Sequence, residues 1–207
     1  MESKNPKRRR ERRTKAVIEE VLWKAVENQI IKKGINNLTI IGIAQEAKIE
    51  PPVIYNRFKN LNDILEKYIR KYDYWLNDII KIVDKKSDPK DCLKKIFTKL
   101  IEELYKNEVM QKILLWELSD TNPIANRSST NRELYSGTLF RYFNETLEKA
   151  DIEPEPFFAI IIGGIYYSIL HRKVSTFCKI DFNTDNGKEI LIDTIDKIIE
   201  TSFKNKK

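Results

Sequence analysis

Residues 38–65, LTIIGIAQEAKIEPPVIYNRFKNLNDIL, carry two short helical patterns separated by a tight turn. Thr39 is suited to cap the first helix, and Pro51 and Pro52 fit the first turn of the second, where a missing N–H group costs nothing. The first helix places its apolar residues on one face: Ile40, Ile43, Ala44 and Ala47. A small residue is needed where the two helices cross, and Ala44 supplies it. Together these features predict a helix-turn-helix.

The second helix of such a motif lies in the major groove of DNA, with its first residues and outer face toward bases and phosphates. Asn and Arg bond adenine and guanine through paired hydrogen bonds, so Asn56 and Arg57 are candidates for base recognition. Thr39, Tyr55 and Lys59 are suited to phosphate oxygens, which fix position rather than read sequence. The expected contact surface is completed by Pro51, Pro52 and Val53.

Positive charge is concentrated in the first third of the chain. Residues 1–60 hold 14 Lys and Arg against 7 Asp and Glu, whereas residues 61–207 hold 24 against 24. The segment 4–13, KNPKRRRERR, has seven basic residues and one acid. Such a run is usually a solvated tail. Directly before a helix-turn-helix, it is expected to lie along phosphates or enter a minor groove, chiefly through Arg8, Arg9 and Arg10.

The composition favours a folded protein of the cytoplasm. At 207 residues, 41% hydrophobic and 33% charged, the chain can bury a core. Its longest uncharged run, 156–170, is shorter than the roughly 20 residues of a membrane-spanning helix, and no signal peptide is visible. Cys92 and Cys178 match no metal or redox spacing, so we expect reduced thiols, no metal site and no cofactor.

The remaining sequence predicts an all-α protein of about nine helices without a sheet. We expect a DNA-binding domain over residues 1–59, with three helices, and a larger helical domain over 60–207 for ligand binding and dimerisation. The predicted helices are 9–33 (closed by Gly34), 40–47, one from Pro51, 60–85, 88–107, a short one through 118, 123–150, 157–177 and 184–204.

Several positions occur in a recognisable order: Gly34, Leu38, Thr39, Ile43, Ala44, Glu46, Ala47, Ile49, Ile54, Tyr55, Phe58, Lys59, Asn60 and Leu65. This pattern resembles the TetR/AcrR family of bacterial transcription regulators over about residues 10–65. The resemblance implies a homodimer that binds a palindromic operator in double-stranded DNA and responds to a small molecule. Lys48 departs from the family's usual turn glycine, and Glu50 replaces the usual Ser or Thr cap.

The resemblance also implies that the last two helices pair with their copies in a dimer. The segment 157–170 is apolar nearly all round, which a surface helix of a monomer does not tolerate, and its glycines allow close approach. A central helix buried in a monomer is the alternative. The expected interface residues are Ile161, Gly163, Gly164, Ile195 and Ile199.

A ligand pocket has weaker support, because aromatic residues at helical spacing more often fill a core. The family resemblance favours a cavity among them, and few ionisable residues interrupt the most apolar helix, so we expect a small, mostly apolar effector. The candidate lining residues are Tyr72, Trp75, Tyr105, Trp116, Tyr135, Phe140, Tyr167 and His171, the only histidine.

The sequence therefore predicts a sequence-specific DNA-binding transcription regulator, a repressor that its effector releases from the operator. The alternative is a helical protein-interaction or membrane-surface module whose basic N-terminus binds anionic partners without sequence preference. An enzyme is not expected, because no nucleophile motif, glycine-rich phosphate loop or Cys/His cluster is visible.

Overall fold

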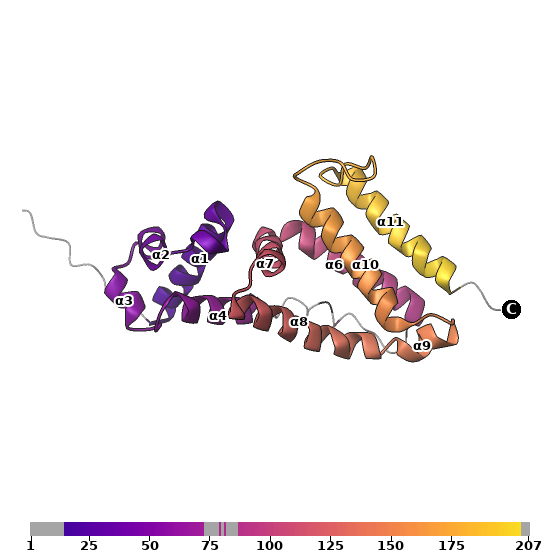
Figure 1. Cartoon of the computed structure of the whole chain (residues 1–207), viewed down its shortest axis with the longest axis horizontal. Coiled ribbons are helices and arrows are strands. Elements are labelled where there is room, and N and C mark those ends of the chain that lie inside the picture. The colour runs from indigo at the N-terminus through magenta and orange to yellow at the C-terminus, as the bar shows by residue number, and fades with distance from the viewer. Residues whose placement is uncertain (1–14, 73–78, 80, 82–86, 204–207) are drawn as a thin grey trace, which may run out of the picture. The chain divides into compact units, whose positions relative to one another are not determined.

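A computed structural model describes residues 15–72, 79, 81 and 87–203, without the side chains of Tyr72, Tyr135, Thr138 and Leu139 (Figure 1). The described residues form ten α-helices, one 3-10 helix and no strand, which confirms the all-α prediction. The chain divides into two compact units, the head (Met1–Leu61) and the body (Asn62–Lys207). The elements are α1 Lys15–Lys33, η1 Ile35–Asn37, α2 Ile40–Ala47, α3 Pro51–Tyr55, α4 Leu61–Tyr72, α6 Pro89–Lys106, α7 Glu108–Ser119, α8 Pro123–Arg141, α9 Asn144–Lys149, α10 Pro154–His171 and α11 Asp185–Ser202.

The head is built on the packing of α1 against α2. α1 buries one face, formed by Leu22, Ala25, Val26, Gln29 and Ile30. Gly34 follows this helix with a φ of 78°, a value that favours glycine, and its N–H bonds the carbonyl of Ile30. The first part of the predicted helix 9–33 lies outside the described residues. From Lys15 onward the helix is confirmed.

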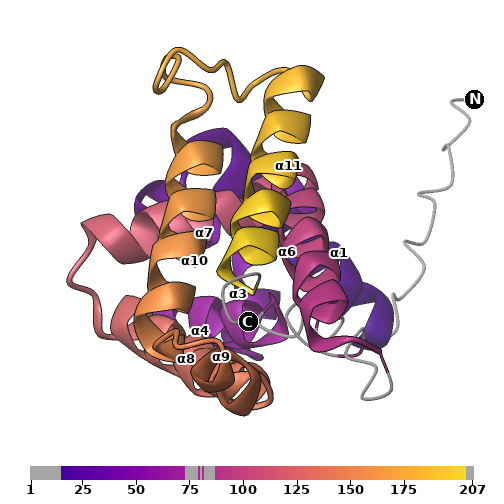
Figure 2. The same cartoon turned by 90° about the vertical axis from the view of Figure 1, so that its right-hand side faces the viewer.

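The body centres on α6, which packs against both α10 and α11. In Figures 1 and 2, α10 and α11 run side by side on one side of the body. Apolar residues of these three helices form a shared core with residues of α7, α8 and α9. Asp88 caps α6 by accepting from the Lys90 N–H at 2.8 Å, as its sequence predicts. Of the predicted helix 60–85, α4 covers the first part, and most of 73–86 lies outside the described residues.

Three predicted helix boundaries are wrong. The helix expected over 123–150 breaks at Phe143, whose N–H bonds Phe140 three residues back and whose ring is fully buried in the core. Burial of this ring outweighs helical continuity, and α9 begins at Asn144. The helix expected from 157 begins instead at Pro154, because proline suits a first helical position.

The predicted helix 157–177 also ends early, at His171. Cys178 and Lys179 both have positive φ, at 50° and 65°, and the backbone of Phe177 exchanges two hydrogen bonds with Ile180. This is the geometry of a tight hairpin turn, which no periodicity in the sequence indicates. Thr184 then caps α11 by accepting from the Gly187 N–H at 3.0 Å.

Candidate functional site

A hydrogen bond defines each end of α2, the first helix of the helix-turn-helix. Thr39 caps α2 as predicted, with its hydroxyl oxygen accepting from the Gly42 N–H at 3.0 Å. At the other end, Lys48 is left-handed (φ 53°, ψ 46°), and the N–H of Ile49 bonds Ala44 at 3.0 Å. This pattern of bonds reverses the chain after α2. A non-glycine residue in this conformation costs about 1–2 kcal/mol, so the departure at Lys48 is a strained position.

The helix crossing needs glycine as well as the predicted Ala44. Ala44 and Gly42 are both buried. A Cβ added at Gly42 would lie 3.0 Å from the Thr39 Oγ1 and 3.1 Å from the Gln29 Oε1 of α1. Sequence reasoning missed this residue, because its need arises from the side chain of a different helix.

Glu46 ties α2 to α1 through several polar side chains. Its carboxylate accepts from Asn28 and Lys32, each at 3.0 Å, and from Gln29 at 3.4 Å. The Lys32 hydrogen bond, followed by that of Asn28, lowers the pKa of Glu46. The recurring Glu of the family pattern is therefore a clamp between two helices in this chain.

α3 buries one face and exposes the other. Ile54 and Phe58 are buried, and the Phe58 ring meets the Trp23 ring of α1 edge to face at 5.5 Å between centroids. The two prolines occupy the first helical positions, as predicted. Glu50 precedes them as the N-cap, but its side chain makes no capping bond. The frame holding α3 is thus apolar and aromatic.

The predicted DNA contacts divide into exposed and held side chains. The exposed residues are Thr39, Pro52, Tyr55 (56% exposed), Asn56 and Lys59. The half-buried residues are Pro51, Val53 and Arg57. α3 ends at Tyr55, so Asn56 and Arg57 lie in the turn directly after it rather than within the helix. Arg8, Arg9 and Arg10 lie outside the described residues.

Arg57 makes a contact that the sequence does not reveal. Its Nη1 donates to the carbonyl of Val53 at 3.0 Å, one turn earlier in α3. This bond satisfies a carbonyl near the end of a short helix and holds the guanidinium against it. Asn56 has no such side-chain bond among the described residues and extends into solvent.

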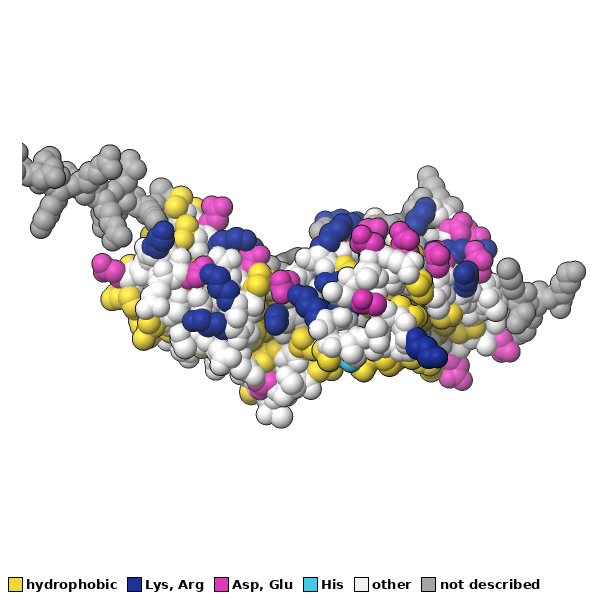
Figure 3. All heavy atoms as spheres, turned by 90° about the horizontal axis from the view of Figure 1, so that it is seen from above, with side chains coloured by type: hydrophobic (Ala, Val, Ile, Leu, Met, Phe, Trp, Pro, Cys, Tyr) yellow, Lys and Arg dark blue, Asp and Glu magenta, His cyan; other side chains and the backbone are white. Residues whose placement is uncertain are grey.

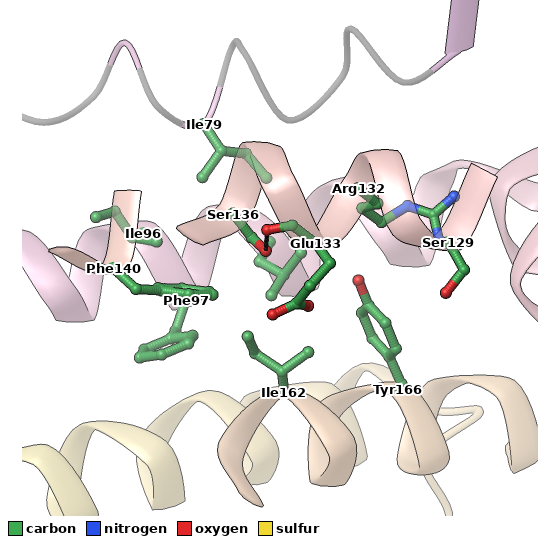
Figure 4. A pocket seen from close by; sticks show the side chains of 11 residues that line it. Ile79, Ile96, Phe97, Ser129, Arg132, Glu133, Ser136, Phe140, Ile162 and Tyr166 are labelled. Carbon is green, nitrogen blue, oxygen red and sulfur yellow. Dashed lines mark hydrogen bonds between the residues drawn. The ribbon is translucent and has the colours of Figure 1, made fainter. Parts of the chain in front are cut away.

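The body contains two adjoining cavities between α8 and α10, of about 170 and 250 Å³. Both far exceed the ~10–15 Å³ that one water requires. They share Glu133, Phe140 and Ile162 as lining residues. Figure 4 shows the first of them, with rings and aliphatic side chains at one end and polar groups at the other. Its other lining residues are Ile79, Ile96, Phe97, Leu100, Ser129, Arg132, Ser136 and Tyr166.

A buried ion pair supports the polar end of this cavity. Arg132 of α8 donates through both terminal nitrogens to Glu117 of α7, and the Nη2 contact is 2.8 Å. The two side chains are only 9% and 5% exposed. Burial raises the pKa of the neighbouring Tyr166, which keeps its phenol neutral. Neither charged residue was predicted, because a buried pair from two helices has no local sequence signal.

Of the predicted pocket residues whose side chains the structure describes, Phe140 alone lines either cavity. The Tyr105 hydroxyl donates to the carbonyl of Phe182 at 2.8 Å, and the Trp116 indole donates to Asp120 at 3.0 Å. Tyr167 and His171 stack on each other at 5.1 Å, away from both cavities. Trp75 and the side chains of Tyr72 and Tyr135 lie outside the described part of the chain.

The predicted interface residues separate in the same way. Ile161, Ile195 and Ile199 are buried in the core of the body, so the structure does not present them on its surface. Gly163 and Gly164 are exposed on the outer face of α10, with no heavy atom within 4 Å of an added Cβ. The expected interface residues of α10 therefore lie on both of its faces, and those of α11 lie on its buried face.

The outer face around α10 carries exposed apolar side chains. They are Ile160 (75% exposed), Tyr167, Val174, Phe177 and, on α11, Ile198. Figure 3 shows hydrophobic side chains gathered along one edge of the body. The Tyr167 ring also meets Phe177 at 4.7 Å between centroids, which joins α10 to the hairpin turn.

None of the described helices is long and apolar enough to cross a membrane. Among the same residues, no three His, Cys, Asp or Glu side chains are grouped so that they could hold a metal ion.

No model of a known protein family matches the sequence, and no curated protein matches it. Solved structures do match. The fatty acid degradation regulator FadR of Bacillus halodurans is 15% identical, with a TM-score of 0.71, over 94% of this chain and all of that one. FadR of Bacillus subtilis, solved in complex with stearoyl-CoA, is 16% identical, with a TM-score of 0.63, over 91% of this chain and all of that one.

A TetR-family transcription regulator from Marinobacter aquaeolei VT8 is 14% identical, with a TM-score of 0.63, over 88% of this chain and 95% of that one. These likenesses extend through the body, where the sequence pattern offered helix number and size alone. The resemblance drawn from residues 10–65 is thereby confirmed for the fold. The chain has the fold of the TetR-family transcription regulators along nearly its whole length.

Proposed function

We propose that this protein is a homodimeric transcription regulator of the cytoplasm, with a DNA-reading head and an effector-binding body. The exposed side of α3 and its following turn carry the proposal, because a buried frame holds polar side chains toward solvent. In the proposed assignment, residues 1–59 bind DNA and residues 60–207 bind the effector and the second copy. Repression, relieved by the effector, is the proposed mode of action.

In the head, Asn56 is the leading candidate for reading a base. It is exposed directly after α3, and Asn is suited to paired hydrogen bonds with adenine. Tyr55 and Lys59 flank it for phosphate contacts, and the Thr39 hydroxyl retains its hydrogen for a phosphate while its oxygen caps α2. Arg57 has a positioning role through Val53, and contact with guanine requires donors other than Nη1.

Most of the head's excess charge lies in its first residues. Residues 1–14 hold seven Lys and Arg against two acids, whereas residues 15–60 hold seven against five. We therefore assign the salt-dependent part of the affinity chiefly to Arg8, Arg9, Arg10 and their neighbours. Glu50 at the start of α3 carries a negative charge close to the expected phosphate path, which moderates the affinity.

The dimer forms, in this proposal, through the outer face of α10 and α11. Ile160, Tyr167 and Ile198 are exposed apolar residues on these helices, and Gly163 with Gly164 leaves room for a close backbone approach. A second copy presents the same face, so a two-fold axis pairs apolar surface with apolar surface. Two heads then read two half-sites about 34 Å apart, which is the basis of a palindromic operator.

Alanine at Gly163 and Gly164 tests this face. An added Cβ meets no heavy atom within 4 Å, so a monomer accepts the change and its helix gains up to about 1 kcal/mol. In a dimer packed closely through this face, the added methyl groups instead push the two copies apart and weaken the interface. Sedimentation equilibrium is expected to show a weaker dimer together with unchanged or higher thermal stability of the monomer. Unchanged dimerisation would exclude this face as the interface.

The effector is proposed to occupy the cavities between α8 and α10. Their walls are mostly apolar with a few polar groups, which is typical of small-molecule sites. The likeness to a regulator solved with stearoyl-CoA supports an effector with a substantial apolar part.

A route from the cavity to the head runs through α8 and α4. Glu66 of α4 contacts Arg127 of α8 at 3.5 Å, and the adjacent Ser128 accepts from Arg132 at 3.4 Å. α4 follows the head directly in the chain, so a shift of α8 on effector binding reaches it through these side chains. Release follows to the extent that the effector binds the DNA-incompetent state more tightly.

Selection of bound duplexes from a random pool tests the proposed function. The expected result is a palindromic consensus, and titrations should show that binding to it exceeds binding to other duplexes by about 10³-fold or more. Binding that is indifferent to sequence, with a steep salt dependence, would instead identify a basic interaction module and contradict the proposal.

A further inference from the structure

The polar groups of the cavity between α8 and α10 define the charge that its occupant can carry. Figure 4 shows Arg132, Ser129 and Tyr166 at one end, Phe97, Phe140 and Ile96 at the other, and the Glu133 carboxylate between them. An occupant that fills the space therefore places an apolar body against the rings and a polar group near Glu133. This charge selectivity rests on the proposed effector site and adds to it.

The positive charge of Arg132 is neutralised within the protein. Both terminal nitrogens bond Glu117, and Nη2 also contacts the Ser128 hydroxyl at 3.4 Å. A ligand anion could recruit Arg132 only by displacing Glu117, whose carboxylate is 5% exposed and would lose its cation while still buried. Removing one partner of a buried pair is strongly unfavourable. Arg132 therefore does not serve as an anion receptor.

No Lys or Arg side chain among the described residues forms an ion pair with Glu133, which lines both cavities. The second cavity is also lined by Arg141 and Glu155, whose charges are opposite, and the Arg141 Nε donates to the carbonyl of Gly137 at 3.3 Å. The Arg132–Glu117 pair is neutral as a unit, so Glu133 gives the described lining residues of the first cavity a net negative charge. A carboxylate or phosphate placed there would meet repulsion, whereas a cation would meet attraction.

An aromatic ring adds to the same preference. Tyr166 lines the cavity near Glu133, and the face of such a ring attracts an ammonium or amidinium group. The apolar end, lined by Ile96 and Phe97, accepts a hydrocarbon body.

We infer that this cavity selects an amphiphilic organic cation, with an ammonium or amidinium group at Glu133 and an apolar body toward Phe97. The adjoining cavity shares Glu133, Phe140 and Ile162, so a longer apolar body can extend along α8 and α10.

Calorimetric titration of the full chain with three ten-carbon probes tests the inference. The probes decylammonium, decanol and decanoate have alkyl groups of the same length and differ in the charge of their polar group. We expect decylammonium to bind about tenfold more tightly than decanoate, with decanol between them. The factor is no larger because Glu133 is partly solvated, and one ion pair near solvent contributes only a moderate binding free energy. Equal binding of the three, tighter binding of decanoate, or no binding by any probe would overturn it.

Glu133→Gln supplies the variant, and Glu148→Gln of α9 the matched control. Glu133→Gln should bring decylammonium close to the affinity of decanol and leave decanol unchanged. Glu148 is exposed and lines neither cavity, so its variant makes the same change in net charge and should keep the full preference. Loss of preference in both variants would assign the effect to overall charge and contradict a role for Glu133.

Operator binding by the same samples separates this inference from the proposed function. A protein that binds its operator and shows no cation preference refutes the charge selectivity alone. A protein that prefers the cation and binds no operator refutes the proposed regulator alone.

Discussion

The head and the body each begin a helix with the same device, a threonine cap followed three residues later by glycine. In the head the Thr39 hydroxyl accepts from Gly42, and in the body Thr184 accepts from Gly187, both at 3.0 Å. A Cβ at Gly42 would meet two side-chain oxygens, at 3.0 and 3.1 Å, whereas one at Gly187 would lie 2.0 Å from the Asp181 carbonyl oxygen. With the same local pattern, the glycine of the head allows a second helix to approach, whereas the glycine of the body allows the preceding backbone to approach.

The polar clusters of the two units differ in how far they are buried. Glu46 clamps α1 to α2 at the edge of the head, with amide and ammonium partners near solvent. Arg132 and Glu117 form a single pair inside the body, beside a cavity. The head buries no charged side chain among its described residues, and its one buried polar side chain there is Gln29. The body places its charged groups inside, where each costs more to disturb.

The largest expected effect is therefore at Glu117. Glu117→Gln leaves the Arg132 charge buried without its carboxylate and should lower the free energy of unfolding by about 3–5 kcal/mol. Urea denaturation at fixed protein concentration measures it. The double variant Glu117→Leu with Arg132→Met is the control and should recover most of the loss. A loss below about 1 kcal/mol in the single variant would mean that the pair is solvated.

Alanine at the two cap glycines compares the units directly. Gly187→Ala forces a Cβ against the backbone and should cost about 2–3 kcal/mol, as overpacking does. Gly42→Ala displaces side chains that can move, at the expense of the cap, and should cost about 1 kcal/mol. Thermal denaturation of both variants gives the order. The reverse order would show that the contact with Gln29 is the more rigid of the two.

Glycine at the two left-handed lysines should stabilise both units by a smaller amount. Lys48 in the head and Lys179 in the body have φ of 53° and 65°. Replacing either by Gly relieves strain but increases the entropy of the unfolded chain, for a net gain of about 0.5–1 kcal/mol. Differential scanning calorimetry on each variant checks this. Destabilisation by Lys48→Gly would indicate that its side chain supports the turn.

The smallest effect is the pH dependence of the α1–α2 clamp. The hydrogen bonds from Lys32 and Asn28 hold the pKa of Glu46 below its usual value of 4.5. A carboxyl with a lowered folded pKa stabilises fully above its unfolded pKa, and this contribution is lost as the pH falls through the folded pKa. Hydrogen exchange of the α2 amides should therefore accelerate below about pH 4.5 relative to Glu46→Gln. Identical pH profiles would contradict the clamp.

These differences also explain what the sequence could predict. The described helices of the head were predicted closely, because caps, turn prolines and the apolar set around Ile43 and Ile54 act over a few positions. Its missed features, Gly42 against Gln29 and Arg57 bound to Val53, depend on how side chains meet in space.

For the body, the sequence predicted the helical class but few of the residues that line its cavities. Aromatic spacing pointed to Tyr105 and Trp116, which proved to bond structural groups near α6 and α7. Arg132 and Glu133 looked like ordinary charged positions on a polar helix, because only the packing of α8 on α7 and α10 brings them to a cavity. Cavities arise from pairings between distant segments, and periodicity carries no signal for them.

The central claim is that the side chains exposed on and after α3 read DNA. Titration of the full chain with its selected duplex and a scrambled duplex, at several salt concentrations, tests it most directly. The prediction is tighter binding to the selected duplex by about 10³-fold or more, and a loss of about 1–3 kcal/mol in Asn56→Ala confined to that duplex. Equal binding to both duplexes, with Asn56→Ala unchanged, would contradict the account.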